Sequence, residues 1–373
     1  MPKLYMVVNE DRFFLSHRKE IALAAQQDGW QVRIVCKDTG QRSDVQALGL
    51  QMIDLPINPT GTNLLEELRT LWFLYRLYRH DRPDVVHHVG VKNILWGGIA
   101  AKLAKIKGVV NAVSGLGVLF SGESFSFKTR LILAAMRYAN RRQHVSLIFQ
   151  NLEDRQLFIS RRIATTDQCE YIKGSGVNLT EFAYTPEPPY PPIKVILTAR
   201  MVREKGIEIL IKAAELLRPE MEGRVIFQLC GGLHKNPKGY KDYELQAMCD
   251  GRYVQWLGHR NDVCQLLKQS HIVTLPSYYR EGLPKSLIEA AAIGRPIVTT
   301  DSYGCKDTVV HGVNGFLVPV KDPQALADRL RQLINDPDLR QRMGRASRQK
   351  AELEFSVDRV IDHHLYLYRK SLA

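Results

Sequence analysis

The chain of 373 residues has no uninterrupted apolar run that approaches the length needed to cross a membrane. Its first residues, Met1-Pro2-Lys3, lead straight into a short apolar strand followed by charges, so we expect no signal peptide. The six cysteines are scattered and form no C-x-x-C pair, which argues against disulfides and zinc. We therefore expect a cytoplasmic protein with free thiols and no membrane-spanning helix.

Several catalytic motifs are missing as well. The sequence contains no H-E-x-x-H, no Walker loop and no Ser/His/Asp arrangement, and no G-x-G-x-x-G follows the first predicted strand. One Asp-x-Asp string, Asp336-Pro337-Asp338, falls between two predicted helices, where Asp-Pro is an ordinary helix start. These patterns give no indication of a metal site.

Acidic residues are scarce relative to basic ones, and the formal net charge is +13. Residues 92–142 alone hold nine basic residues and one acid. An anionic membrane surface, a nucleic acid or a merely solvated face would each account for this excess. Aromatic residues among the bases, such as Phe120 and Phe125, favour the membrane surface. No nucleic-acid-binding motif is visible, so we expect no nucleic acid partner.

Strand and helix patterns alternate along most of the chain, which predicts an α/β fold with parallel sheets covered by helices on both faces. The chain is too long for one ordinary core. Five prolines in the nine positions 184–192 favour an extended linker. We predict Rossmann-like domains over residues 1–183 and 193–355, and a carboxyl-terminal helix over 356–373 that packs back on the first domain.

The segment 64–79 has a strong helical periodicity of apolar residues. Such a stripe is typical of a helix that packs on a sheet. We predict that its large residues face the core, namely Leu65, Leu68, Leu71, Trp72, Tyr75 and Leu77.

Residues 272–300 predict the order strand, loop, helix and strand. Pro284 stands where a first helical residue would stand. The backbone N–H groups of Gly282 and Leu283 would then lie at a helix amino terminus, where free donors and the helix dipole favour a diphosphate.

Two carboxylates flank this predicted anion site. Glu281 stands just before the helix, and Glu289 lies roughly 7–8 Å further along the helix axis. Carboxylates accept hydrogen bonds from paired sugar hydroxyls, so one ligand could meet both. The alternative is a pair of solvated charges, although the apolar neighbours of Glu289 make an idle charge unusual there.

A basic loop, residues 200–206, follows the first predicted strand of the second domain and opens a helix. Arg200 and Lys205 could converge on a diphosphate and stabilise the charge of a leaving nucleotide without a metal. A basic loop alone is usually solvated, but this one shares a domain with the predicted anion site.

Cations also stand at the ends of predicted strands in the first domain, where the ligand crevice of a parallel sheet lies. His17, Arg18 and Lys92 could bind an anionic acceptor such as a lipid diphosphate, and Gly115 lies in a neighbouring loop. The alternative is ordinary surface polarity. His87 could equally be a strand histidine with satisfied hydrogen bonds.

The block from Glu281-Gly282-Leu283-Pro284 to Glu289 and Gly294-Arg295-Pro296 resembles the E-x7-E element of the retaining family 4 glycosyltransferases of GT-B fold. The resemblance spans most of the chain, and it implies two Rossmann-like domains that face a central cleft. This chain departs from the wider family because it lacks a Gly-Gly pair after its first strand.

The resemblance also implies roles for individual residues. Arg200 and Lys205 would hold the donor diphosphate, Glu289 the ribose and Glu281 the transferred sugar, while His259 and Arg260 would flank the base. The donor would be a nucleotide sugar, most simply UDP-linked, with no metal cofactor. Glu281, Arg200 and Lys205 would thus form the catalytic group.

The residues around His17, Lys92 and Gly115 resemble those of bacterial transferases that extend undecaprenyl-diphosphate-linked sugars in O-antigen, capsule or N-glycan assembly. This implies a lipid-linked glycan acceptor and a position on the inner face of the plasma membrane. The alternatives are a GT-B epimerase or phosphorylase, and a non-enzymatic basic protein that binds membranes or nucleic acid. Neither explains both cations and both carboxylates as well.

Overall fold

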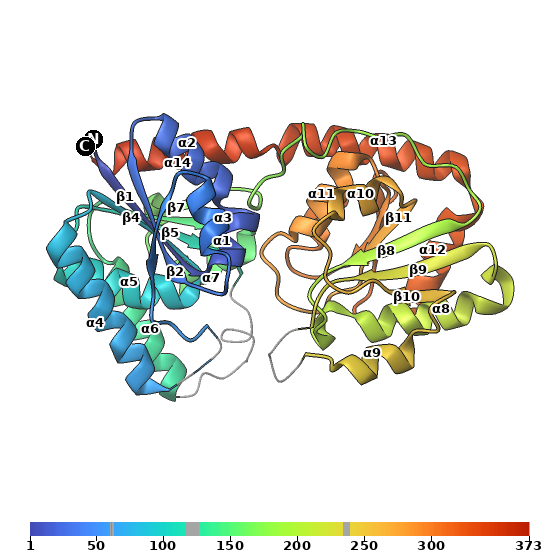
Figure 1. Ribbon diagram of the computed structural model, residues 1–373, viewed down its shortest axis with the longest axis horizontal. Coiled ribbons are helices and arrows are strands. Elements are labelled where there is room, and N and C mark those ends of the chain that lie inside the picture. The colour runs from blue at the N-terminus through green and yellow to red at the C-terminus, as the bar shows by residue number, and fades with distance from the viewer. Residues whose placement is uncertain (60, 62, 116–126, 234–238, 373) are drawn as a thin grey trace. The chain divides into compact units, whose positions relative to one another are not determined.

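The computed structural model describes residues 1–59, 61, 63–115, 127–233 and 239–372. The chain divides into two compact units. The first comprises Met1–Ser175 and Val357–Ala373, and the second comprises Gly176–Ser356. Each unit is a parallel sheet covered by helices, coloured along the chain in Figure 1.

The first unit has a seven-stranded parallel sheet in the order β3-β2-β1-β4-β5-β6-β7. Its strands are β1 Lys3–Glu10, β2 Gln31–Lys37, β3 Gln51–Asp54, β4 Val85–Val89, β5 Gly108–Val113, β6 Val145–Phe149 and β7 Cys169–Tyr171. Its helices are α1 Asp11–His17, α2 Lys19–Gln27, α3 Arg42–Ala47, α4 Leu64–Asp81, α5 Val91–Leu103, α6 Phe127–Asn140, α7 Leu152–Ser160 and α14 Val357–Lys370.

Alternate residues of the first strand supply two separate cores, one on each face of this sheet. Tyr5 and Val7 pack with residues of α4, α5, α6 and α7. Leu4, Met6 and Val8 pack with residues of α1, α2, α3 and α14. The carboxyl-terminal helix α14 therefore completes the core of the first unit, where it packs against α2.

The second unit has a six-stranded parallel sheet in the order β10-β9-β8-β11-β12-β13. Its strands are β8 Ile193–Thr198, β9 Val225–Cys230, β10 Val254–Trp256, β11 Ile272–Leu275, β12 Ile297–Thr300 and β13 Gly315–Val318. Its helices are α8 Ile207–Met221, α9 Asp242–Met248, α10 Val263–Lys268, α11 Lys285–Ile293, α12 Pro323–Asn335 and α13 Pro337–Glu354. The predicted α/β fold with two Rossmann-like domains is confirmed.

Both sheets have a switch point, where the strand order reverses and the connections leave in opposite directions. It lies between β1 and β4 in the first unit and between β8 and β11 in the second. In open parallel sheets the crevice at the carboxyl ends of the strands beside this point is the usual ligand site.

The proline-rich segment 184–192 belongs to the second unit, and the units divide earlier, between Ser175 and Gly176. Buried Arg295 donates to the carbonyl oxygen of Thr185 over 2.7 Å. Buried Arg340 pairs with Glu187 at 2.6 Å. These two arginines attach the predicted linker to the surface of the second unit.

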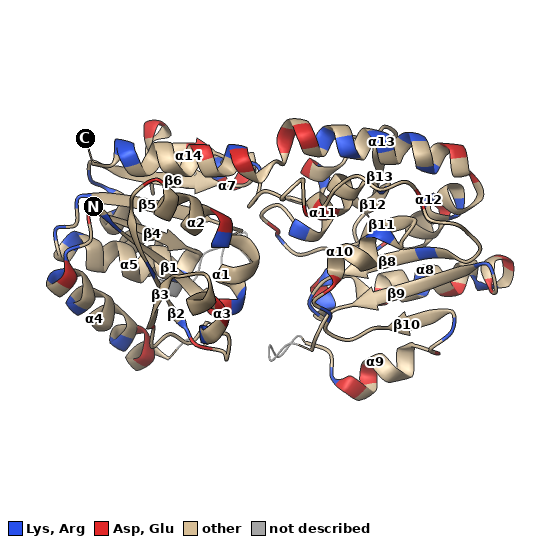
Figure 2. Ribbon diagram, turned by 45° about the horizontal axis from the view of Figure 1, so that its top comes forward, with Lys and Arg blue, Asp and Glu red and all other residues tan. Residues whose placement is uncertain are grey.

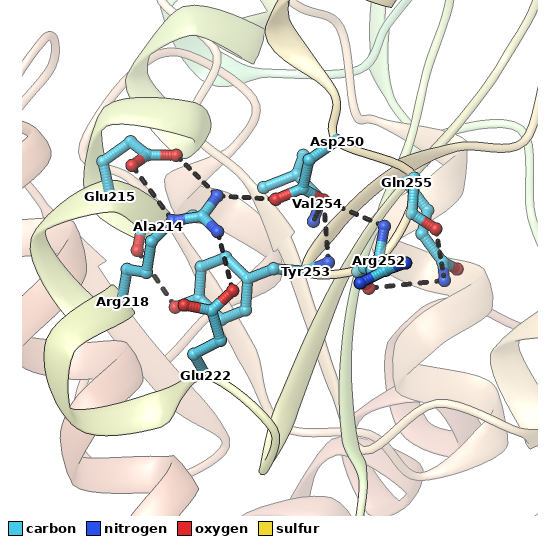
Figure 3. A network of polar contacts seen from close by, with 10 residues as sticks. Ala214, Glu215, Arg218, Glu222, Asp250, Arg252, Tyr253, Val254 and Gln255 are labelled. Carbon is cyan, nitrogen blue, oxygen red and sulfur yellow. Dashed lines mark hydrogen bonds and ion pairs between the residues drawn. The ribbon is translucent and has the colours of Figure 1, made fainter.

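A polar network fixes the loops at the amino-terminal ends of the strands of the second sheet, on the side opposite to the switch-point crevice (Figure 3). Asp250 accepts hydrogen bonds from the backbone N–H groups of Arg252, Tyr253 and Val254 at 2.8–3.0 Å. Arg218 pairs with the same carboxylate at 2.8 Å. The backbone donors and Arg218 outweigh desolvation and lower the pKa of Asp250 to about 2. The charges of Asp250 and Arg218 therefore stabilise the fold at a place away from the switch-point crevice.

The prediction for helix α4 is wrong in part. Leu65, Leu68 and Trp72 are exposed by 75, 46 and 60%, whereas Glu67 and Thr70 are buried. Glu67 is held inside because it pairs with the Lys92 ammonium and accepts a hydrogen bond from the Trp96 indole. The remaining predicted core residues, Leu71, Tyr75 and Leu77, pack partly buried against the first core.

The described helices contain none that is long and apolar enough to span a membrane. The aromatic part of the basic segment, with Phe120 and Phe125, lies outside the described residues.

Candidate active site

The second unit brings two loops together at its switch point, one after β8 and one after β11. Gly206 follows the short helix Arg203–Lys205 and has a left-handed backbone, with φ 77°. A Cβ atom at this position would lie 2.1 Å from the carbonyl oxygen of Pro276. Only glycine therefore allows the Lys205 turn to press against the end of β11.

This contact places a cation beside a carboxylate. Lys205 Nζ lies 2.5 Å from Glu281 Oε1, and each side chain is 12% exposed. Ser277 Oγ lies 3.0 Å from the same carboxylate oxygen and 3.0 Å from the carbonyl oxygen of Glu204. The predicted diphosphate ligand Lys205 and the predicted sugar ligand Glu281 thus form one partly buried ion pair.

The loop between Glu281 and α11 is held by a second glycine. A Cβ atom at Gly304, whose φ is 75°, would lie 1.9 Å from the carbonyl oxygen of Gly282. Helix α11 begins at Lys285, so Pro284 is its N-cap residue and lies one position earlier in the helix than predicted. Pro284 itself makes no side-chain capping hydrogen bond. Gly282 and Leu283 therefore immediately precede the amino terminus of α11, where backbone N–H groups point out of the helix.

The second carboxylate, Glu289, lies within α11 and is largely withdrawn from water. Burial raises its pKa to about 7, and Lys285, whose Nζ is 3.9 Å away, partly opposes the rise. Near neutral pH this carboxyl group is divided between its two protonation states. A ligand that donates hydrogen bonds to it would favour the ionised state.

Two more strand ends, those of β9 and β10, lie beside the end of β8. A Cβ atom at Gly231 would lie 1.7 Å from the carbonyl oxygen of Ala199, and the Gly231 N–H donates to the carbonyl oxygen of Gly258 over 2.8 Å. His259 packs beside Gly232. The predicted donor residues Arg200 and His259 are exposed on this same edge.

Arg260 follows His259 and is also exposed. Its guanidinium pairs with Asp262 at 2.6 Å. The structure thus places every predicted donor residue at one edge of the second sheet, and it joins Lys205 to Glu281 directly.

The predicted acceptor residues of the first unit make internal contacts. Arg18 is only 2% exposed, and burial lowers its pKa to about 10. Lys92 Nζ pairs with Glu67 at 2.5 Å and donates to the carbonyl oxygens of Asn58 and Gly61. His17 is half-buried and stacks on Phe13 with ring centroids 4.4 Å apart.

Gly115 follows the end of β5, directly before the residues that are not described. At the switch point itself, Asn93 donates to Asn9 over 2.9 Å. His87 is buried, and its Nδ1 lies 2.6 Å from the Tyr368 hydroxyl of α14. The acceptor roles of these residues stay predictions.

Sequence reasoning missed Ser277 and Gly304 as parts of the site. Ser277 stands at the end of a strand, four residues before Glu281, which is a usable signal for a polar contact. The role of Gly304 depends on a contact between loops after different strands, and no local pattern indicates it. No group of three or more His, Cys, Asp or Glu that could hold a metal ion occurs among the described residues.

Comparison with protein families gives two matches that together cover most of the chain. Residues 3–151 match the model "Glycosyl transferase 4-like", and residues 186–350 match "Glycosyl transferases group 1". The matches follow the two units.

Two curated relatives cover nearly the whole chain. An N,N'-diacetylbacillosaminyl-diphospho-undecaprenol alpha-1,3-N-acetylgalactosaminyltransferase of Campylobacter jejuni is 26% identical over 95% of this chain and 97% of its own length. A UDP-Gal:alpha-D-GlcNAc-diphosphoundecaprenol alpha-1,3-galactosyltransferase of Escherichia coli is 25% identical over 90% of this chain and 88% of its own length.

Among solved structures, Anabaena Alr3699/HepE in complex with UDP and glucose matches with a TM-score of 0.80 at 21% identity, and each chain is covered in full. A glycosyltransferase from Rickettsia africae matches with a TM-score of 0.79 at 17% identity, covering 100% of this chain and 98% of that chain. The fold, the two family models and the E-x7-E block agree, and the chain belongs to the family 4 glycosyltransferases of GT-B fold.

Proposed function

We propose that this glycosyltransferase moves a hexose or N-acetylhexosamine from a UDP-sugar to a polyprenyl-diphosphate-linked saccharide, with retention at the anomeric carbon. The observation that carries the proposal is the Lys205–Glu281 ion pair at the switch point of the second sheet. The two relatives that match along nearly the full chain are named for transfer to undecaprenyl-diphosphate-linked sugars.

In this proposal the donor diphosphate binds between the Lys205 ammonium, the Arg200 guanidinium and the amino-terminal end of α11. Lys205 would turn from Glu281 toward the more highly charged diphosphate, which leaves the Glu281 carboxylate to accept hydrogen bonds from the sugar. Both cations would stabilise the negative charge that builds on the diphosphate as the sugar leaves.

The nucleoside end would bind along the same edge of the sheet. Glu289 would accept hydrogen bonds from the ribose hydroxyls, and the loop of His259 and Arg260 would flank the base. Because the two cations supply the positive charge, the reaction would need no metal. The acceptor would bind to the first unit, and the protein would act at the inner face of the plasma membrane without contact to nucleic acid.

A transfer assay with purified protein tests the proposal. UDP-linked glucose, galactose, N-acetylglucosamine and N-acetylgalactosamine are each incubated with a short-chain polyprenyl-diphosphate-linked sugar, with and without EDTA. Mass spectrometry detects the product and NMR gives its anomeric configuration. We expect an α-linked product that forms equally in EDTA. Failure of all four donors to transfer or hydrolyse would contradict the proposal, and loss of activity in EDTA would contradict metal independence.

A further inference from the structure

Helix α4 of the first unit carries its apolar residues on the outside. Leu64, Leu65, Leu68 and Trp72 are 66, 75, 46 and 60% exposed and recur at helical spacing. We call these four residues the α4 face. A helix that covers a sheet in water normally points such residues inward. Contiguous apolar surface of this kind marks an interaction site more often than a chance exposure.

Specific contacts hold polar side chains on the inner face of this helix, so that its large apolar side chains face outward. On its inner side, Glu67 binds the Lys92 ammonium at 2.5 Å, and Thr70 donates to the carbonyl oxygen of Pro56 over 2.6 Å. These buried polar contacts fix the rotation of the amino-terminal half of the helix. The outward position of Leu65 and Trp72 is therefore set by the fold and not by chance packing.

The α4 face lies beside the ligand edge of the first sheet. The carboxyl end of α4 leads within a few residues into β4, so the helix runs opposite to the strands and starts at their carboxyl-terminal edge. Lys92, at the start of α5 just beyond the end of β4, binds Glu67 near the start of α4, in agreement with this placement. The exposed leucines therefore stand at the edge that holds the switch-point crevice.

Basic residues accompany the apolar ones on the outer side of the same helix. Arg69, Arg76 and Arg79 are exposed, and Figure 2 shows basic residues along α4. On α6, which packs with α5 beside α4, Leu131 and Tyr138 are exposed as well. Leucine and tryptophan bordered by arginine suit the boundary between lipid headgroups and acyl chains, where the indole and the cations meet anionic headgroups.

We propose that the α4 face is the surface by which the first unit lies on an anionic lipid bilayer. It would insert Leu64, Leu65, Leu68 and Trp72 at the level of the acyl boundary. The function of this contact depends on the proposed lipid-linked acceptor. The diphosphate of such an acceptor lies at the level of the lipid headgroups, and the contact would bring the strand ends of the first sheet close to it. The contact itself can be measured without any transfer reaction.

Vesicle binding tests the proposal. The full-length protein is floated with phosphatidylglycerol vesicles and with phosphatidylcholine vesicles at low salt. The variant Leu65→Gln/Leu68→Gln/Trp72→Gln removes most of the face. Its matched control, Leu216→Gln/Leu353→Gln, removes two exposed leucines of the second unit. We expect the first variant to bind phosphatidylglycerol vesicles at least about tenfold more weakly than wild type, and the control to bind like wild type.

Tryptophan emission supplies a second readout that does not depend on the variants. Trp72 is exposed, whereas Trp30 is buried and Trp96 and Trp256 are half-buried. We expect wild-type emission to shift to the blue with phosphatidylglycerol vesicles and to be quenched by lipids brominated on the acyl chain. Thermal melting of each variant within a few degrees of wild type confirms that the fold is retained.

Two results would overturn the proposal. One is wild-type vesicle binding that the triple variant retains in full. The other is a concentration-dependent dimer in sedimentation that the triple variant abolishes while no protein binds vesicles, because a second copy would then cover the face. Failure of the proposed function is distinguishable: wild-type protein would bind vesicles through the α4 face and yet transfer no sugar.

Discussion

The two units have the same arrangement of parallel strands around a switch point, but their charges serve different purposes there. In the second unit, Lys205 pairs with Glu281 at the strand ends, and both lie on loops that a ligand can reach. In the first unit, Arg18 is buried, and Lys92 is bound to Glu67 and to two carbonyl oxygens. The same sheet topology therefore holds its cations in two ways, in an ion pair at the proposed diphosphate site of the second unit and in contacts with loops of the first.

The buried histidines sharpen this contrast, and we expect them to give the largest effect. In the first unit, burial lowers the pKa of His87 well below its usual value, that of His88 to about 4 and that of His364 to about 3. The second unit has one such residue among those described, His271, with a pKa of about 4.

A histidine that stays neutral in the folded state binds fewer protons there than in the unfolded state. The free energy of unfolding therefore decreases as the pH falls below about 6.5, and it stops decreasing below the folded-state pKa of each histidine. At pH 5 each would cost the folded state about 2 kcal/mol. Hydrogen exchange of strand peptides at pH 7 and pH 5 measures this. We expect β4 and β5 to lose protection well before β8 and β9, and equal losses in both sheets would contradict the assignment.

Removal of the Lys205 ammonium tests whether the cation of the second unit acts on the donor diphosphate. The variant Lys205→Ala takes away a cation from the leaving diphosphate, so we expect kcat/KM for transfer to fall about 10²- to 10³-fold. Steady-state kinetics with a UDP-sugar measure the loss. Lys205→Arg is the matched control, and we expect it to retain part of the activity because it keeps the charge. Full activity of Lys205→Ala would rule out its role.

Lys92→Met tests whether the cation of the first unit stabilises the fold through its pair with Glu67. Lys92 and Glu67 are 24 and 11% exposed, and the variant leaves Glu67 without its cation. We expect the free energy of unfolding to fall by about 1–3 kcal/mol, with the affinity for UDP-sugar unchanged. Chemical denaturation and calorimetry measure the two quantities. A fall in donor affinity with unchanged stability would contradict this structural role of Lys92.

The raised pKa of Glu289 predicts the smallest effect. Ribose hydroxyls bind better to the ionised carboxylate, so affinity for UDP-sugar should rise as the pH rises through about 7. The ionised fraction grows about tenfold between pH 6 and pH 8. Calorimetry at the two pH values measures the change, and Glu289→Gln should bind equally at both. The same pH dependence in that variant would place its origin elsewhere.

The sequence predicts the fold of this protein well because the signals for it are local. Apolar runs, helix periodicity and the turn at Gly294 lie within short segments, and the alternation of strands and helices predicts parallel sheets. Lys205 and Glu281 are candidates for the same reason, because each lies in a loop that follows a predicted strand. That the two loops meet depends on the neighbouring positions of β8 and β11 in the sheet.

The failures of prediction arise where distant residues decide. The orientation of α4 depends on Glu67 and its partner Lys92, which is 25 residues away. Buried Arg18 interacts electrostatically with Tyr368, which comes from the far end of the chain and belongs to the core on one face of the first sheet. Periodicity alone favours the wrong face of α4, because buried polar contacts override the general preference for apolar residues inside.

A crystal structure with a bound UDP-sugar would show whether the second unit holds an activated sugar by its diphosphate at the Lys205–Glu281 pair. We predict diphosphate oxygens within hydrogen-bond distance of Lys205 Nζ and of the backbone at the start of α11, with Glu281 turned to the sugar. A UDP-sugar bound away from the strand ends of β8 and β11, with the ion pair intact, would contradict the account.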